Sequence, residues 1–193
     1  MRTISVVVAT LAAISISSQA SAKPKPEHNH FNAVCEAEMT RAAGEHGVPL
    51  GVLFAVALNE SGRRGWLHPY ALNVAGKSYF PGSPAEAMAK FAEERARGVK
   101  LIDLGCMQIN HHYHGREFGS PQAMLDPGRN VDYAALFLKR LRAQHGSWTM
   151  AAARYHAGPN NAPAQKRYVC GVIRNLVASG FGEWTEGARS FCA

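Results

Sequence analysis

Apolar residues recur three or four positions apart along most of the chain, and segments that alternate apolar with polar residues are few and short. This spacing is typical of helices with one buried face. It predicts helices over residues 31–46, 49–60, 84–97, 127–144, 148–158 and 163–179. Short β-prone runs such as 99–102 lie on either side of the third helix. We therefore expect a mainly α domain with a small β or loop element near residues 70–106.

Several predicted helices begin at residues with strong capping preferences. Ser83-Pro84-Ala85-Glu86 offers a capping hydroxyl, a proline suited to the first turn and a glutamate that completes a capping box. Asp126-Pro127 opens the helix over 127–144, and Ser147 can cap the helix that follows. Gly98 and Gly180 stand just after two predicted helices, where glycine commonly ends a helix.

The first residues have the organisation of a secretory signal peptide. Arg2 supplies a positive start, residues 4–16 are apolar, and Ala20-Ser21-Ala22 is an A-x-A cleavage signal. The apolar run is too short for a membrane-spanning helix, although an uncleaved anchor is the alternative. We expect residues 1–22 to be removed, residues 23–30 to form a disordered mature terminus, and the protein to be periplasmic.

The remaining sequence fits one domain with an excess of positive charge. About 170 residues follow position 22, which is enough for a single hydrophobic core that does not depend on disulfides or metals for its stability. We expect the domain to cover 31–180, followed by a tail over 181–193. Without Arg2 the net charge is about +6, which suits an anionic partner such as cell wall, membrane surface or nucleic acid. Four cysteines lie in this part and indicate two disulfides, with three possible pairings.

Glu60 stands on the apolar face of a predicted helix. On a helical wheel, Leu50, Leu53, Val56 and Ala57 form one arc, and Glu60 falls in its middle. An apolar environment disfavours the charged form of a carboxyl group. A carboxylic acid that keeps its proton can donate it to a leaving oxygen. Glu60 is therefore a candidate general acid.

The alternative for Glu60 is structural, because Arg63 or Arg154 can hold a buried carboxylate as an ion pair.

A second group of polar residues follows within 105–110. Gln108 and Asn110 are two positions apart, so in an extended segment both amides face the same side and suit hydroxyl and N-acetyl groups. An ordinary polar turn is the alternative for this segment.

Four short motifs occur in a characteristic order: E-S-G at 60–62, G-x-M-Q-x-N at 105–110, D-P-x-x-N at 126–130 and R-Y-x-A-G at 154–158. Together they resemble the lytic transglycosylase family over roughly residues 31–178. The resemblance implies a lysozyme-like, goose-type helical fold and cleavage of peptidoglycan without a cofactor or metal. His156 departs from the asparagine that is usual in the last motif.

The resemblance assigns roles to six residues. Glu60 would be the single catalytic acid/base, and the substrate-binding residues would be Ser61, Met107, Gln108, Asn110 and Tyr155. Ser61 would position the sugar N-acetyl group or the carboxylate, and Met107 would pack beside the sugar. Gln108 and Asn110 would line the cleft, with Tyr155 near the catalytic carboxylate.

The resemblance also bears on the disulfides and on partners. Cys106 lies inside the amide motif, where a disulfide would brace the cleft wall, so we favour Cys35–Cys106 with Cys170–Cys192, which tethers the tail. The long segment between the first two motifs is similar to that of small family members that accompany secretion systems and flagella. We expect a monomer that binds glycan strands, with such an apparatus as a further partner and without nucleic acid, for which no basic motif is present.

Three alternatives to a transglycosylase stay open at this point. Asp103 can serve as the second carboxylate of a lysozyme-type hydrolase, or it can be a turn or salt-bridge residue. His111, His112 and His114 have spacing that can ligate zinc, with His156 possible as a fourth ligand. A non-catalytic glycan-binding assembly factor would keep the fold without the reaction.

Overall fold

The computed structural model describes residues 26–61, 67–156 and 161–193, without the side chains of 26–29 and Ser61. Its helices are α1 (Pro26–His46), α2 (Leu50–Ser61), α3 (Pro84–Ala96), α4 (His111–Phe118), α5 (Pro121–Met124), α6 (Pro127–His145), α7 (Trp148–His156), α8 (Ala162–Ala178) and α9 (Glu186–Cys192). Its strands are β1 (Leu72–Val74), β2 (Lys77–Tyr79), β3 (Ile102–Leu104) and β4 (Ile109–Asn110). The mainly α class is therefore confirmed.

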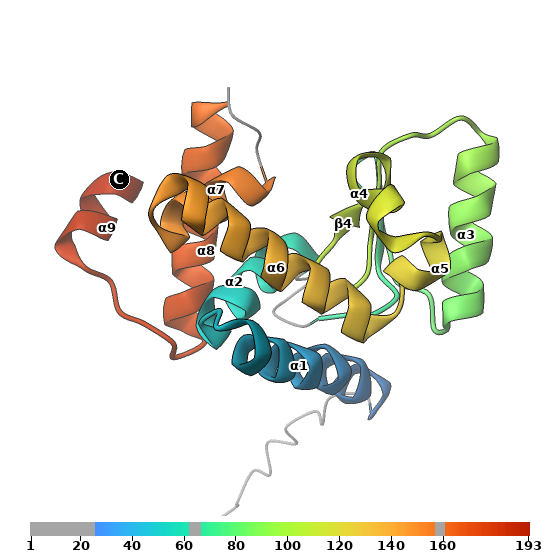
Figure 1. Cartoon of the computed structure of the whole chain (residues 1–193), viewed down its shortest axis with the longest axis horizontal. Helices are drawn as coiled ribbons and strands as arrows, with labels where there is room; N and C mark the ends of the chain where they lie inside the picture. Colours follow the sequence, from blue (N-terminus) through green and yellow to red (C-terminus); the bar gives the residue numbers. More distant parts are fainter. Residues whose placement is uncertain (1–25, 62–66, 157–160) are drawn as a thin grey trace, which may run out of the picture.

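Helices α1, α2, α6, α7 and α8 pack together, and the small sheet lies beside them with α3 to α5. Helix α1 packs along α6, α2 packs along α8, and α7 contacts both α6 and α8. Figure 1 shows α6 running between the α7–α9 side of the molecule and the sheet with α3 to α5. The strands follow the order β2-β1-β3-β4 and pair in antiparallel register. This sheet is the β element expected near 70–106, and it extends to Asn110.

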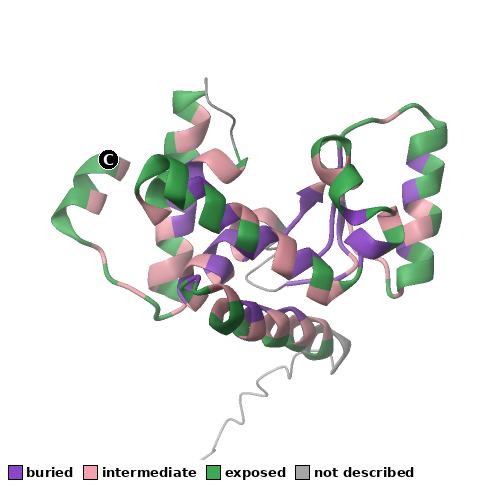
Figure 2. Ribbon diagram, in the orientation of Figure 1, coloured by how far each residue is buried: buried purple, intermediate pink, exposed green. Residues whose placement is uncertain are grey.

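The core joins the inner faces of the helices to the inner face of the sheet. Figure 2 shows buried residues on α1, α2 and α6 and along the strands. The largest fully buried side chains include Met39 on α1, Leu53 on α2, Leu104 on β3 and Leu138 on α6. Side chains from far apart in the sequence thus meet in one core, which fixes the end of α2 relative to the sheet.

The capping signals in the sequence are used as predicted. Ser83 accepts from the N–H of Glu86, and the Glu86 carboxylate reaches back to the N–H of Gly82. Asp126 caps α6 by accepting from the N–H of Arg129. Ser147 accepts from the N–H of Met150 at the start of α7. The end of the helix expected to reach residue 158 lies outside the described residues.

Helix α1 begins at Pro26, five residues before the start that the sequence predicted for the first helix. The start of α1 is held by tertiary contacts that the local sequence does not show. Phe31 packs against the rings of His68 and Tyr70, and Asn32 accepts from the N–H of Leu67. The helices α4, α5 and α9 were also not predicted; α4 and α5 are short, and α9 lies in the segment expected to be a tail.

Both favoured disulfides are present. Cys35–Cys106 joins α1 to the turn between β3 and β4, and Cys170–Cys192 joins α8 to α9. Two disulfides are compatible with a compartment outside the cytoplasm. The expected signal peptide at 1–22 lies outside the described residues, and among the described helices none has the length and apolarity that crossing a membrane requires.

Candidate active site

A cavity of about 280 Å³ opens where the end of α2, the sheet and α7 meet. Glu60, at the end of α2, lines it with a side chain that is 15 % exposed. Asp103, Gln108 and Asn110 line the cavity from the sheet side, and Tyr155 and His156 line it from α7. The carboxyl group predicted from the helical wheel is therefore brought together with these five residues, all of which the sequence analysis named.

Among the described residues, His156 is the partner of the Glu60 carboxyl. Nδ1 of His156 lies 3.3 Å from Oε1 of Glu60. The His156 ring stacks on Tyr168 of α8, with centroids 4.4 Å apart and planes 10° from parallel. Arg63 lies outside the described residues, and no described contact joins Arg154 to Glu60. The hydrogen bond to Glu60 raises the pKa of His156 above its ordinary value.

Asp103 lies in the same cavity, in the middle of β3. It pairs with Asn110 across β3 and β4, and Nδ2 of Asn110 donates to Oδ1 of Asp103 at 2.6 Å. Burial raises the pKa of Asp103 to about 6, the charge of Glu60 adds to this rise, and Asn110 and His156 oppose it. The cavity thus contains two carboxyl groups, and the charge of Glu60 makes ionisation of Asp103 less favourable.

Gln108 does not lie in an extended segment, as the sequence analysis expected. It belongs to the turn between β3 and β4 and has a φ of 48°, in the left-handed region. Its Nε2 donates to the carbonyl oxygens of Ala71 and Gly105, at 3.1 and 2.9 Å. The amide of Gln108 therefore holds the turn together. Although Gln108 is buried, it also contributes to the wall of the cavity.

Asn110 lines the cavity at the end of β4, where it also caps α4. Its Oδ1 accepts from the N–H of His112, and its Nδ2 is bound to Asp103. Both polar ends of this amide are therefore engaged within the protein. The expected extended segment is thus wrong at Gln108, while both amides line the cavity and also hold the backbone around it.

Met107 is fully buried and does not line the cavity among the described residues. The expected role of this side chain beside a sugar stays a prediction. Its peptide group has a different role, because the N–H donates to Oδ1 of Asn130 and the carbonyl accepts from the Tyr155 hydroxyl at 2.9 Å. Ser61 ends α2, but its side chain is outside the described part.

Tyr155 is positioned as the sequence analysis expected, close to the carboxyl groups of the cavity. Burial raises the pKa of its phenol well above the ordinary value, and the charge of Glu60 adds to the effect. The hydroxyl therefore stays protonated and donates to the carbonyl of Met107. Tyr168 behaves similarly, because burial and then the charge of Glu60 raise the pKa of its phenol.

Asn130 holds the turn between β3 and β4 in place through its side-chain amide. The sequence analysis gave it no role. It is fully buried on α6, donates to the carbonyls of Leu104 and Met124, and accepts from the N–H of Met107. Gly105 has a φ of 83°, and a Cβ there would lie 2.6 Å from the Asn130 amide nitrogen. An amide beside the apolar face of α6 was the signal that could have revealed this support.

The histidines predicted as alternative zinc ligands are not gathered around a common point. His111 packs against Phe91, and Nδ1 of His114 lies 2.8 Å from the Tyr133 hydroxyl. Burial lowers the pKa of both His111 and His114. His112 is exposed, and His156 contacts Glu60.

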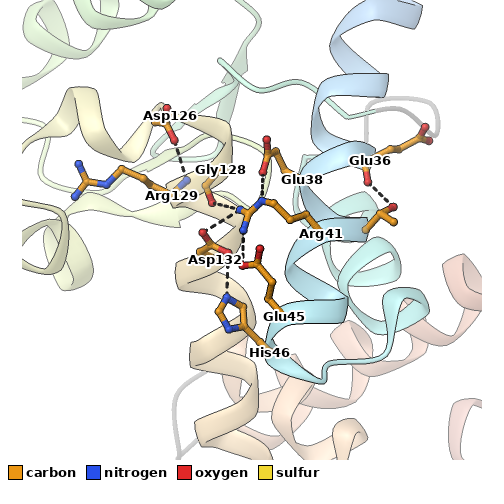
Figure 3. Close-up of polar contacts among 10 residues, drawn as sticks. Glu36, Glu38, Arg41, Glu45, His46, Asp126, Gly128, Arg129 and Asp132 are labelled. Atoms are coloured by element: carbon orange, nitrogen blue, oxygen red, sulfur yellow. Dashed lines mark hydrogen bonds and ion pairs between the residues drawn. The ribbon is translucent and has the colours of Figure 1, made fainter.

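The described residues contain one other group with suitable spacing for a metal: Glu45, His46 and Asp132. Figure 3 shows the guanidinium of Arg41 in the centre of this group. Arg41 donates to Glu45 and Asp132, at 2.7 and 2.9 Å, while His46 binds the other Asp132 oxygen at 3.0 Å. The arginine neutralises the carboxylates and joins α1 to α6, so this cluster is accounted for as an ion-pair network.

Comparison with known families supports the resemblance seen in the motifs. Residues 38–174 match the family described as Transglycosylase SLT domain. Comparison with curated proteins and with solved structures gives no significant match. The match covers most of the chain and contains the cavity-lining residues from Glu60 to His156. The chain therefore belongs to the SLT transglycosylase family, whose members are lyases that act on peptidoglycan.

Proposed function

We propose that this protein cleaves the β-1,4 bond between N-acetylmuramic acid and N-acetylglucosamine, with Glu60 as its single general acid/base. The observation that carries the proposal is the position of Glu60, a largely buried carboxyl at the end of an apolar helix that opens into the cavity. A carboxyl in this place can donate a proton to a leaving oxygen that lies within the cavity.

The proposed reaction is non-hydrolytic and returns the proton to the enzyme. Glu60 donates its proton to the glycosidic oxygen, the bond from that oxygen to C1 breaks, and the transition state is oxocarbenium-like. The acetamido oxygen of the substrate stabilises C1, so a second carboxylate is not required. The muramyl 6-hydroxyl then bonds to C1 as its proton passes to Glu60, which gives a 1,6-anhydro product.

A second candidate, hydrolysis, is favoured by one observation: Asp103 lines the same cavity as Glu60. A carboxylate there can activate a water for attack on C1, as in lysozyme-type muramidases. Two features count against this role: the hydrogen bond with Asn110 holds the Asp103 side chain against the sheet, and burial disfavours the ionised form that would activate water.

The test is mass spectrometry of the muropeptides released from purified peptidoglycan by the wild type, Glu60→Gln and Glu183→Gln. Glu183 is exposed and absent from the described cavity lining, so its variant controls for the loss of a carboxylate. We expect products one water lighter than reducing-end muropeptides from the wild type and the control, and at least about a hundredfold less from Glu60→Gln. Reducing-end products would instead establish the hydrolase.

We also propose that the protein acts in the periplasm, on cell wall close to a secretion or flagellar apparatus. The signal-peptide pattern at 1–22, the two disulfides and the long segment between the first two motifs support this role. Cross-linking in cells followed by identification of bound proteins tests it. A wild type that binds but does not cleave purified glycan would favour the assembly-factor alternative.

A further inference from the structure

His156 makes a contact with Glu60 that joins three helices at one point. Glu60 belongs to α2, His156 to α7 and Tyr168 to α8. The near-parallel stack on Tyr168 fixes the plane of the His156 ring, and Nδ1 in that plane lies 3.3 Å from the Glu60 carboxyl. The side chain of His156 is 48 % exposed, so its ring also has access to solvent.

The surroundings of His156 are rich in groups that carry negative charge or none. Asp103 faces the cavity from β3 and His114 from α4, while Tyr155 and Tyr168 have phenols that stay protonated. Among the described residues that line the cavity there is no lysine or arginine. His156 and His114 are thus the described side chains of the lining that can become cations. Burial lowers the pKa of His114 and favours its neutral form.

This arrangement gives His156 a role that depends on the proposed function of Glu60. We propose that His156 is a positioning residue that holds a proton in contact with Glu60, so that the pair, rather than the carboxyl alone, supplies the proton for glycosidic cleavage. The pair begins with one proton, on the imidazole or the carboxyl. That proton passes through Glu60 to the glycosidic oxygen, and the proton of the muramyl 6-hydroxyl later restores it.

The pKa shift of His156 is consistent with this role. The hydrogen bond to Glu60 raises the pKa of His156, and the charges of Glu60 and Asp103 raise it further against an opposing effect of burial. Interacting groups titrate as a unit, so the pair keeps one proton until the pH exceeds this raised value. A carboxyl group without such a partner loses its proton at a lower pH than the pair does. His156 therefore extends proton donation toward neutral and alkaline pH.

The first test is the pH profile of kcat/KM for muropeptide release from purified peptidoglycan, at constant ionic strength. His156→Asn keeps a polar group but cannot titrate, and His156→Phe keeps an aromatic ring to stack on Tyr168. We expect both variants to lose about tenfold or more at pH 7.5 but less than about threefold at pH 5.5, which moves the alkaline limb by about one unit. His145→Asn, at an exposed histidine absent from the described cavity lining, should keep the wild-type profile.

The second test needs no enzymatic activity. NMR titration of the His156 ring in the full mature chain should give a pKa above 6.5, and Glu60→Gln should lower it by about half a unit or more. If Glu60→Gln leaves the titration of His156 unchanged, the proposal is overturned. It is also overturned if the His156 variants lose activity equally at all pH values and the alkaline limb of the profile does not move. If the wild type releases no muropeptide at any pH, the proposed function fails, and the titration still decides whether the two groups share a proton.

Discussion

Asp103→Asn should stabilise the protein at neutral pH and not in acid. The folded state raises the pKa of Asp103 from 3.8 to about 6, mainly through burial. A carboxyl with a raised pKa favours the folded state least when it is ionised. The loss of folding stability caused by ionised Asp103 is absent below pH 3.8. It grows as the pH rises from 3.8 to about 6, and it is complete above about 6. At 1.36 kcal/mol per pKa unit, it amounts to about 3 kcal/mol at pH 7.5.

The substitution removes the charge and keeps the local geometry. An asparagine at 103 can still accept from Nδ2 of Asn110 through its own carbonyl oxygen. We expect a gain of about 2–3 kcal/mol in the free energy of unfolding at pH 7.5. At pH 3.5 the gain should be less than about 1 kcal/mol, because Asp103 is then mostly protonated in both states. Urea denaturation followed by circular dichroism at both pH values measures the difference between variant and wild type.

Asp126→Asn is the matched control for this experiment. Asp126 caps α6, and asparagine caps helices about as well as aspartate, so its unfolding free energy should change by less than about 0.5 kcal/mol. A destabilised Asp103→Asn protein, or a gain of equal size at both pH values, would refute the reasoning that burial of the Asp103 charge costs stability.

Two further substitutions, Asn130→Ala and Tyr155→Phe, test the residues that support the site, and Asn175→Ala is the control for the first. Asn130→Ala leaves two carbonyls and the N–H of Met107 without their buried partner, so it should cost about 3–5 kcal/mol in urea denaturation. Asn175→Ala removes one partly buried bond and should cost about 1 kcal/mol; equal losses would contradict this argument. Tyr155→Phe removes the bond to Met107 at a cost of about 1 kcal/mol. It should also slow muropeptide release, and unchanged stability and rate would show that the hydroxyl does not hold the turn.

The parts of the fold that the sequence predicted correctly depend on local interactions. Ser83 and Asp126 cap their helices through bonds to residues three positions away, and such bonds are visible in a short segment of sequence. The position of Glu60 followed from helical spacing alone, because α2 is regular up to its end. These predictions needed no knowledge of how distant segments meet.

The predictions that were wrong depended on contacts between distant segments. Gln108 adopts a left-handed conformation because its amide bonds to Ala71, which is 37 positions away, as well as to Gly105. No local preference of glutamine favours that conformation. The contact between His156 and Glu60 spans 96 positions, so the sequence identified both residues without showing that they meet.

The two candidate reactions place opposite demands on Asp103. A hydrolase needs this carboxyl ionised to activate water, and with a pKa of about 6 the ionised fraction falls below half at lower pH. Its rate should therefore decline in acid with an apparent pKa near 6, and Asp103→Asn should abolish the reaction. A transglycosylase uses Glu60 alone, so a protonated Asp103 costs it nothing and even relieves the repulsion between the two carboxyl groups. Its rate should persist below pH 6 and survive Asp103→Asn. The position of Asp103 thus allows both reactions, but its burial, which disfavours the ionised carboxylate, favours the one that does not need its charge.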